Sequence, residues 1–150
     1  MRVYLDNCCY NRPYDDQSQL RISLETQAKL RIQEMIRKKQ IELSSSYVLL
    51  YENSKNPYLT RQSSIRKFVK ENVSVYVGAE QADEIRILAG GIISTGVKVA
   101  DAYHVACAIV SKSDCFLTTD DRLLKYKDER IRIEDPMDFI RKWEVFGDDD

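Results

Sequence analysis

Short apolar runs alternate with segments of helical periodicity along most of the chain. The apolar runs occupy residues 2–5, 41–44, 73–77, 115–119 and 131–133. Helices are expected over residues 17–38, 47–53, 60–71, 79–88, 99–111, 121–126 and 137–143. Strands that are separated by helices pair in parallel through right-handed crossovers. The alternation therefore predicts an α/β fold, a three-layer α/β/α sandwich with a central, mostly parallel sheet.

The segments between these elements carry signals of turns and helix ends. Residues 7–16 are expected to form a polar loop with aromatic side chains. Ser45 or Ser46 can cap the helix over 47–53, and Pro57 is expected to end that helix. The pair Gly90-Gly91 leaves the end of the helix over 79–88 undetermined.

Composition places the chain among ordinary globular proteins. Its 150 residues are 43% hydrophobic and 31% charged, which predicts one domain over 1–150 with a solvated acidic tail at 148–150. The 23 basic and 24 acidic residues give a net charge of −1, which argues against a passive nucleic-acid-binding module, because such modules neutralise phosphates with lysine and arginine. No apolar run approaches the ~20 residues that span a bilayer, and the N-terminus does not resemble a signal peptide. A cytoplasmic protein without a membrane segment is expected.

Four acidic residues stand at the edges of apolar segments: Asp6, Glu52, Asp101 and Asp120. A carboxylate beside a buried segment is costly unless something compensates its charge. No matching set of lysines or arginines lies inside these segments, and clustered carboxylate oxygens suit Mg²⁺ or Mn²⁺. Asp6 and Asp120 also follow strands, at the edge where parallel sheets place their sites. The sequence therefore predicts a metal-dependent enzyme that acts on phosphate.

The motifs that contain these acidic residues resemble those of the PIN domain family of metal-dependent ribonucleases. The motifs are Val3-Tyr4-Leu5-Asp6, Ser46 through Glu52, Asp101-Ala102-Tyr103-His104-Val105-Ala106-Cys107-Ala108, and Phe116-Leu117-Thr118-Thr119-Asp120. Their order, their spacing and the chain length agree with that family over nearly the whole sequence. Among its members, the chain is most similar to single-domain toxins of VapC type. It departs from the family at Asn7, where many relatives carry Ser or Thr, in the long loop from Cys8 to Asp16, and at Asp121, directly after Asp120.

The resemblance implies a Mg²⁺- or Mn²⁺-dependent endoribonuclease with a PIN-like fold. Asp6, Asp101 and Asp120 are then direct or water-mediated metal ligands, and Glu52 holds a second ion or the attacking water, so that all four are catalytic. As the toxin of a toxin–antitoxin pair, the protein would cleave RNA, be masked by an antitoxin protein and form a homodimer.

Further side chains are expected to support this site. Asn7 and Thr118 are candidates for orienting the carboxylates, and Asp121 for sharing or replacing Asp120. Arg12 and Tyr10 lie in the segment after Asp6 and are candidates for substrate binding, the first by gripping phosphate and the second by stacking on a base.

Each acidic residue also has a structural interpretation. Asp6 can be a turn residue, and Asp101 and Asp120 can be helix caps. Glu52 can be a solvated helix charge. His104, the single histidine, can hydrogen-bond Asp101 three residues before it, but a structural role is favoured because metal-assisted hydrolysis needs no imidazole.

Two other classes of protein stay open on the sequence. One is a catalytically idle PIN-like interaction module, which is favoured if titration with metal does not shift the melting temperature. The other is a Mg²⁺-binding receiver-type signalling domain, which also uses acidic residues at strand ends. That class needs a paired-acid motif after the first strand and a late buried lysine, whereas Asp6 is followed by Asn7-Cys8, and Lys125 and Lys127 lie on an expected helix.

Overall fold

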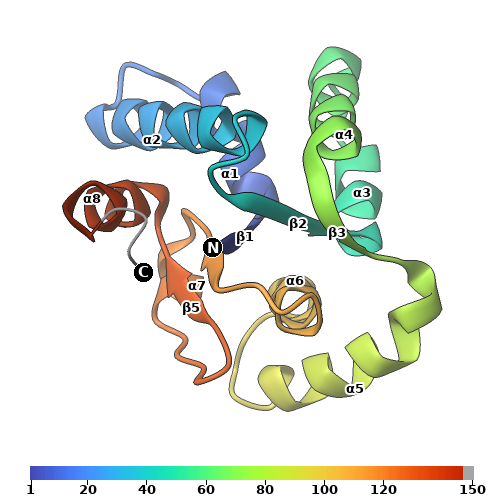
Figure 1. The fold of residues 1–150 in the computed structure, drawn as a ribbon. Coiled ribbons are helices and arrows are strands. Elements are labelled where there is room, and N and C mark those ends of the chain that lie inside the picture. Colours follow the sequence, from blue (N-terminus) through green and yellow to red (C-terminus); the bar gives the residue numbers. More distant parts are fainter. Residues whose placement is uncertain (147–150) are drawn as a thin grey trace.

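Five parallel strands form the centre of the computed structural model, which describes residues 1–146 (Figure 1). The strands are β1 (Arg2–Leu5), β2 (Glu42–Ser46), β3 (Val73–Val77), β4 (Cys115–Leu117) and β5 (Arg132–Glu134). Their order across the sheet is β3-β2-β1-β4-β5, and each neighbouring pair is parallel. The predicted parallel sheet is confirmed, with β1 at its centre.

Helices cover both faces of the sheet and complete the three-layer α/β/α sandwich (Figure 1). One face carries α1 (Asn7–Asn11), α2 (Leu20–Arg37), α4 (Leu59–Asn72) and α8 (Pro136–Phe146). The other face carries α5 (Ala82–Ile93) and α6 (Val99–Val110), and α7 (Asp121–Leu124) adds Leu123 to its core. The helix α3 (Tyr47–Ser54) follows β2 and contributes side chains to both cores.

The strands β1 and β4 are apolar at consecutive positions because they supply both cores. Val3 and Leu5 of β1 are buried in the core beneath α2, whereas Tyr4 between them is buried in the core beneath α6. In β4, Leu117 is buried in the core beneath α2, and Phe116 is buried in the core beneath α6. Successive side chains of a strand point to opposite faces, so a strand covered on both faces has no polar side.

The segment 7–16 differs from the predicted loop. It forms α1 and a 3₁₀ turn, η1 (Arg12–Tyr14). Asp6 caps α1, since its carboxylate accepts from the backbone N–H of Asn7 at 2.8 Å. Cys9 and Tyr10 are buried in the core beneath α2. A helix this short does not form alone, so the cap and the burial, which act only in the folded chain, account for it.

Two helix ends also differ from the prediction. Ser46 caps α3, as its hydroxyl accepts from the N–H of Leu49 at 3.2 Å, but the helix ends at Ser54, before Pro57 is reached. The helix α5, preceded by η2 (Ala79–Gln81), runs through the glycine pair to Ile93. Ile92 is buried in the core shared with α6, and this packing offsets the low helix propensity of glycine.

The acidic tail at 148–150 lies outside the described residues, so its solvation stays a prediction. Within residues 1–146, no helix combines the length and the apolar character needed to cross a membrane.

Candidate metal centre

Asp6 lies directly after β1, at the carboxyl end of the central strand. Its backbone N–H donates to the carbonyl oxygen of Leu117 in β4 at 2.9 Å, which holds the ends of the two strands together. One carboxylate oxygen accepts from the N–H of Asn7, and the other accepts from the hydroxyl of Thr118, both at 2.8 Å. Asp6 is buried. Its carboxylate is therefore fixed in orientation by its own strand end and by the neighbouring one.

Thr118 connects Asp6 with Asp120. Its hydroxyl donates to Asp6 and accepts from the backbone N–H of Asp120 at 3.1 Å. The Asp120 side chain accepts from the N–H of Arg122 at 2.9 Å and so caps α7, as one interpretation of the sequence expected. A single buried hydroxyl thus sets the relative positions of two predicted metal ligands, which is the role that the sequence predicted for Thr118.

Asp101 lies half-buried in the first turn of α6. The cap of that helix is Lys98, so the interpretation of Asp101 as a cap is wrong. Burial, and after it the negative charges of Asp6 and Asp120, raise the pKa of Asp101 to about 6. A carboxylate raises the pKa of another only when the two lie near each other. Asp6 and Asp120 therefore lie near Asp101, although among the described residues the cluster with ligand atoms within 4.8 Å of one another is that of Asp6, Glu52 and His104.

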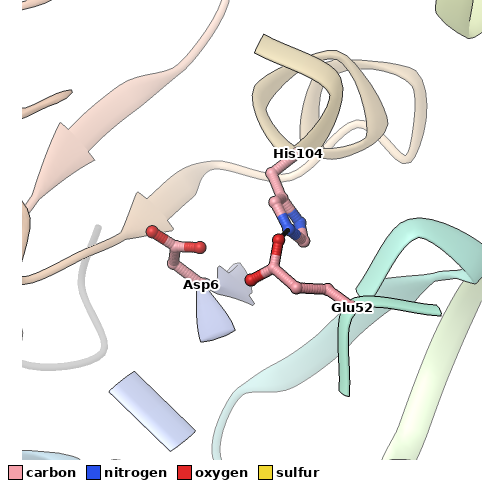
Figure 2. Close-up of side chains that lie close together, drawn as sticks. All are labelled: Asp6, Glu52 and His104. Carbon is pink, nitrogen blue, oxygen red and sulfur yellow. Dashed lines mark hydrogen bonds and ion pairs between the residues drawn. The ribbon is translucent and has the colours of Figure 1, made fainter. Parts of the chain in front are cut away.

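Glu52 reaches the same place from α3 and is held by His104 (Figure 2). The Glu52 carboxylate lies 3.0 Å from Nε2 of His104. On the other side of the ring, Nδ1 lies 2.9 Å from the hydroxyl of Tyr4, which lies 2.6 Å from the hydroxyl of Ser46. This chain of hydrogen bonds runs from the buried strands β1 and β2 to the carboxylate. Glu52 is thus not the freely solvated helix charge that one interpretation allowed.

The contact between Glu52 and His104 changes the proton affinity of both groups. The hydrogen bond from His104 lowers the pKa of Glu52 against the opposing effect of burial, and Asn7 and Lys55 lower it further. Burial alone would lower the pKa of His104, but the bond to Glu52 and the charge of Asp6 outweigh it and raise that pKa. Glu52 therefore holds its negative charge more firmly, and His104 takes up a proton more readily, than the free side chains do.

The donors present fit a hard divalent cation. Asp6, Glu52 and His104 each offer a ligand atom, and these atoms lie within 4.8 Å of one another. The carboxylates of Asp6 and Glu52 point toward one another in Figure 2, while the ring of His104 lies against Glu52. Carboxylate oxygens are the ligands that Mg²⁺ and Mn²⁺ prefer. Because Nε2 of His104 is engaged by Glu52, we assign the imidazole to positioning that carboxylate.

Tyr10 and Asp121 do not take the places predicted from the sequence. Tyr10 is 1% exposed and packs edge-to-face on Phe68, with ring centroids 6.2 Å apart, so its ring has no open face for a base. Asp121 is exposed, and its two oxygens accept from Arg21 of α2 at 2.7 and 2.9 Å. The contact with Arg21 lowers the pKa of Asp121. The negative charge of Asp121 is therefore neutralised by Arg21, and Asp121 does not share the role of Asp120.

Arg12 has a structural role that the sequence did not indicate, and its contact with phosphate stays a prediction. Its guanidinium forms ion pairs with Asp15 at 2.9 Å and with Glu25 at 3.2 Å, and it donates to the hydroxyl of Thr119 at 2.8 Å. Glu25 is 1% exposed, and a carboxylate buried this deeply needs a cation beside it. Arg12 is therefore committed to neutralising Glu25.

Sequence reasoning missed two contacts of the site. It placed His104 against Asp101, whereas the ring bonds Glu52, and no local pattern links positions 52 apart. It also left out Cys8, whose thiol lies 3.3 Å from the Asp6 carboxylate and 3.4 Å from the Thr118 hydroxyl. The position of Cys8 two residues after Asp6 becomes informative only once α1 is known to begin at Asn7.

If Asp101 is a metal ligand, as the sequence predicts, its raised pKa makes the affinity for metal depend on pH. Below pH 6 the side chain holds a proton in the folded protein, and a cation must displace it. We expect the affinity for Mn²⁺ to fall as the pH is lowered from 7 to 5, and to change little between pH 7 and 8. Calorimetric titration in buffers of different ionisation enthalpy measures both the affinity and the proton released. An affinity that stays constant from pH 7 to pH 5 would contradict Asp101 as a ligand.

Comparison with protein-family models and with curated proteins finds no match for this chain. Among solved structures, it is similar to a chain from the crystal structure of VapBC2 from Rickettsia felis bound to a DNA fragment from its promoter. The TM-score is 0.58 at 14% sequence identity, over 90% of this chain and 98% of that chain. At this identity the likeness shows a shared fold. Fold and site together define a class: an α/β/α sandwich with an acidic cluster at the carboxyl ends of its central strands.

Proposed function

We propose that the protein is a Mg²⁺- or Mn²⁺-dependent endoribonuclease of PIN type. The observation that carries the proposal is the cluster of Asp6, Glu52 and His104, whose ligand atoms lie within 4.8 Å of one another. The raised pKa of Asp101, caused by burial and by the carboxylates of Asp6 and Asp120, supports it, because a bound cation would offset that repulsion.

In this proposal, Asp6, Asp101 and Asp120 hold the metal ion. When bound, the ion lowers the pKa of a water and offsets the negative charge that develops on the phosphate. Hydrolysis joins the water oxygen to phosphorus and breaks the bond from phosphorus to one ribose oxygen. The water gives up a proton, and the departing ribose oxygen takes up a proton from solvent and leaves as a hydroxyl group. Glu52 is anionic and half-buried, and it is held in place by His104, so it can orient that water and take its proton.

A basic cavity beside Asp101 supports a polyanionic substrate. It has a volume of about 510 Å³, its floor includes Leu123 and Tyr126, and its lining carries the following cations: Lys98, Arg122, Lys125 and Lys127. Asp101 is the one acidic residue of the lining among the residues that the structure describes. The cavity is large enough for a nucleotide, and its cations would hold phosphates next to the acidic cluster. The positive charge is local, which reconciles this substrate with the net charge of −1.

The likeness to a VapBC2 chain supports a more specific proposal. The protein would be the toxin of a toxin–antitoxin pair, with an antitoxin protein that masks the acidic site and a second copy of itself as partner. The receiver-type alternative loses support, because Lys125 and Lys127 are exposed and cannot supply a buried lysine.

Metal-dependent cleavage of RNA tests the proposal. With single-stranded RNA of mixed sequence, we expect cleavage in Mn²⁺ or Mg²⁺ and none in EDTA. Without RNA, metal at about 100 times its Kd should raise the melting temperature by roughly 5–10 °C, because it binds only the folded state. A rise in melting temperature without cleavage of any RNA would contradict the ribonuclease activity but not the metal centre. The absence of both effects would contradict the metal centre and favour the idle interaction module.

A further inference from the structure

A cavity of about 370 Å³ lies between α2 and α4, apart from the acidic cluster. In Figure 1, α2 and α4 stand on either side of α1, which supplies Tyr10 to the cavity wall. The helix α2 contributes Lys29 and Gln33, and α4 contributes Ile65 and Phe68. None of the predicted metal ligands lines this cavity. It is therefore a separate site, although Tyr10 in its wall belongs to α1, the helix that Asp6 caps.

Lys29 is the unusual residue of this cavity. It is 5% exposed, and within residues 1–146 it has no ion pair and no hydrogen bond. Its amine lies over the face of the Tyr10 ring, with Nζ 5.7 Å from the ring centroid. One turn earlier on the same helix, buried Glu25 is paired with both Arg12 and Arg21. The fold thus neutralises one buried charge of α2 and leaves the other uncompensated.

Burial lowers the pKa of Lys29 to about 8. The amine therefore still carries its proton at pH 7, where the group is a cation that has lost most of its water. A buried charge is destabilising unless a partner of opposite charge and hydrogen bonds replace that water. The structure holds the cation in place but supplies no such partner among the described residues.

Two more polar groups in the cavity lack partners. The hydroxyl of Tyr10 is buried without a hydrogen bond. Gln33 is 7% exposed, lies four residues after Lys29 on the same face of α2, and makes no hydrogen bond within the described part of the chain. Buried polar groups in native proteins are nearly always satisfied. Of these three groups, the Tyr10 hydroxyl is buried without a partner, whereas the polar ends of Lys29 and Gln33 border the cavity and bind no other described side chain. Together they indicate a ligand that accepts hydrogen bonds.

The charges around the cavity indicate the sign of that ligand. Arg37 and Lys67 also line it, and Glu71 is its one acidic residue among those described. The carboxylate of Glu71 lies 3.9 Å from the amine of Lys67 and forms an ion pair with it. The guanidinium of Arg37 lies 3.6 Å from the carboxylate of Glu34. No carboxylate of the lining remains for Lys29. The uncompensated charge of the cavity is therefore positive.

We propose that this cavity is an oxyanion-binding site, in which Lys29 pairs with a phosphate or carboxylate group that also accepts hydrogen bonds from Tyr10 and Gln33. The aliphatic and aromatic side chains of Ile65 and Phe68 leave room for the carbon skeleton that bears the anion. Binding does not depend on metal or RNA, so this site and the proposed nuclease activity stand or fall separately.

Thermal unfolding in EDTA with added inorganic phosphate tests the site at constant ionic strength, with chloride as the reference salt. We expect a saturable rise in the melting temperature, roughly 5–10 °C at 100 times Kd. A second titration with acetate identifies the oxyanion, since a response to acetate alone means a carboxylate site. A wild-type melting temperature that responds equally to phosphate, acetate and chloride would overturn the proposal.

The variant Lys29→Met separates specific binding from the general stabilisation of proteins by phosphate. It keeps the buried stem and removes the charge, so it should melt at a higher temperature than the wild type without phosphate and should lose the saturable rise. Lys70→Met is the matched control, because Lys70 is an exposed lysine of α4 outside the lining, and it should keep the rise. Tyr10→Phe, which removes one hydroxyl, should weaken phosphate binding even if Lys29→Met fails to fold. A saturable rise of unchanged size and midpoint in Lys29→Met, or in Tyr10→Phe where Lys29→Met does not fold, would contradict the site.

Discussion

The variant Asp101→Asn is expected to lose about 100-fold or more of the Mn²⁺-dependent cleavage of RNA while the protein stays folded. Asn keeps the size of the side chain but removes the charge that a metal ion needs. A bound metal contributes several kcal/mol to the transition state of phosphate hydrolysis, and each 1.4 kcal/mol is a factor of ten in rate. Initial rates of cleavage of one labelled oligonucleotide at saturating Mn²⁺ measure the loss.

The same variant should be at least as stable as the wild type when metal is absent. Asp101 is half-buried, and Asp6 and Asp120 repel its charge, so its pKa is about 6 in the folded protein, above the ordinary value of 3.8. A folded-state pKa that is raised for an acid means that stability falls as the pH rises through that window. At pH 7.5, therefore, removing the charge relieves a repulsion. Thermal unfolding in EDTA at pH 7.5 measures this gain, and the gain should disappear near pH 4.

Asp121→Asn is the matched control for this experiment. Asp121 follows Asp120 directly, but its carboxylate is bound by Arg21 and is exposed. Cleavage by this variant should remain close to that of the wild type. Undiminished cleavage by Asp101→Asn would remove the basis of the proposed site, whereas an equal loss in both variants would mean that charge in the region matters and position does not.

The layers of the fold were predictable because they depend on patterns that are local in the sequence. A strand such as Val3-Tyr4-Leu5 is apolar on every position only if both faces are covered, which requires a parallel sheet with helices on both sides. The segment 7–16 was mispredicted because its order depends on contacts far away in the sequence. The aromatic ring of Tyr10 is buried against Phe68, and Arg12 is held by Glu25, and neither partner is visible from the local sequence.

The candidate site was predictable to a similar degree and for a similar reason. Acidic residues that follow strands, such as Asp6 and Asp120, are brought together by the parallel sheet itself, so their proximity follows from the topology. The contact of Glu52 with His104 required knowing how α3 lies relative to α6, which is a matter of packing. Whether these residues bind metal and cleave RNA stays a prediction that the experiments above test.

The variant Thr118→Val is expected to weaken the binding of Mn²⁺ by about 10–100-fold, the usual effect of removing a group that orients a metal ligand. Val fills the space of Thr but has no hydroxyl. Asp6 then loses the donor at 2.8 Å, and the backbone N–H of Asp120 loses its acceptor at 3.1 Å. Asp6 keeps the bond from Asn7 and Asp120 keeps the bond from Arg122, but the contact that links their two segments is lost. Calorimetric titration with Mn²⁺ measures the loss of affinity, and cleavage at saturating Mn²⁺ should fall less than binding does.

Thr119→Val separates this orienting role from the general cost of removing a buried hydroxyl. Thr119 is the adjacent residue and is also buried, but its hydroxyl accepts from Arg12 and does not contact a carboxylate of the site. Both variants should lose stability by about 1–3 kcal/mol, because each leaves a polar group without its partner. Only Thr118→Val should lose affinity for Mn²⁺. Equal affinities in the two variants would mean that Thr118 supports the fold but does not hold Asp6 and Asp120 in the geometry that a metal ion requires.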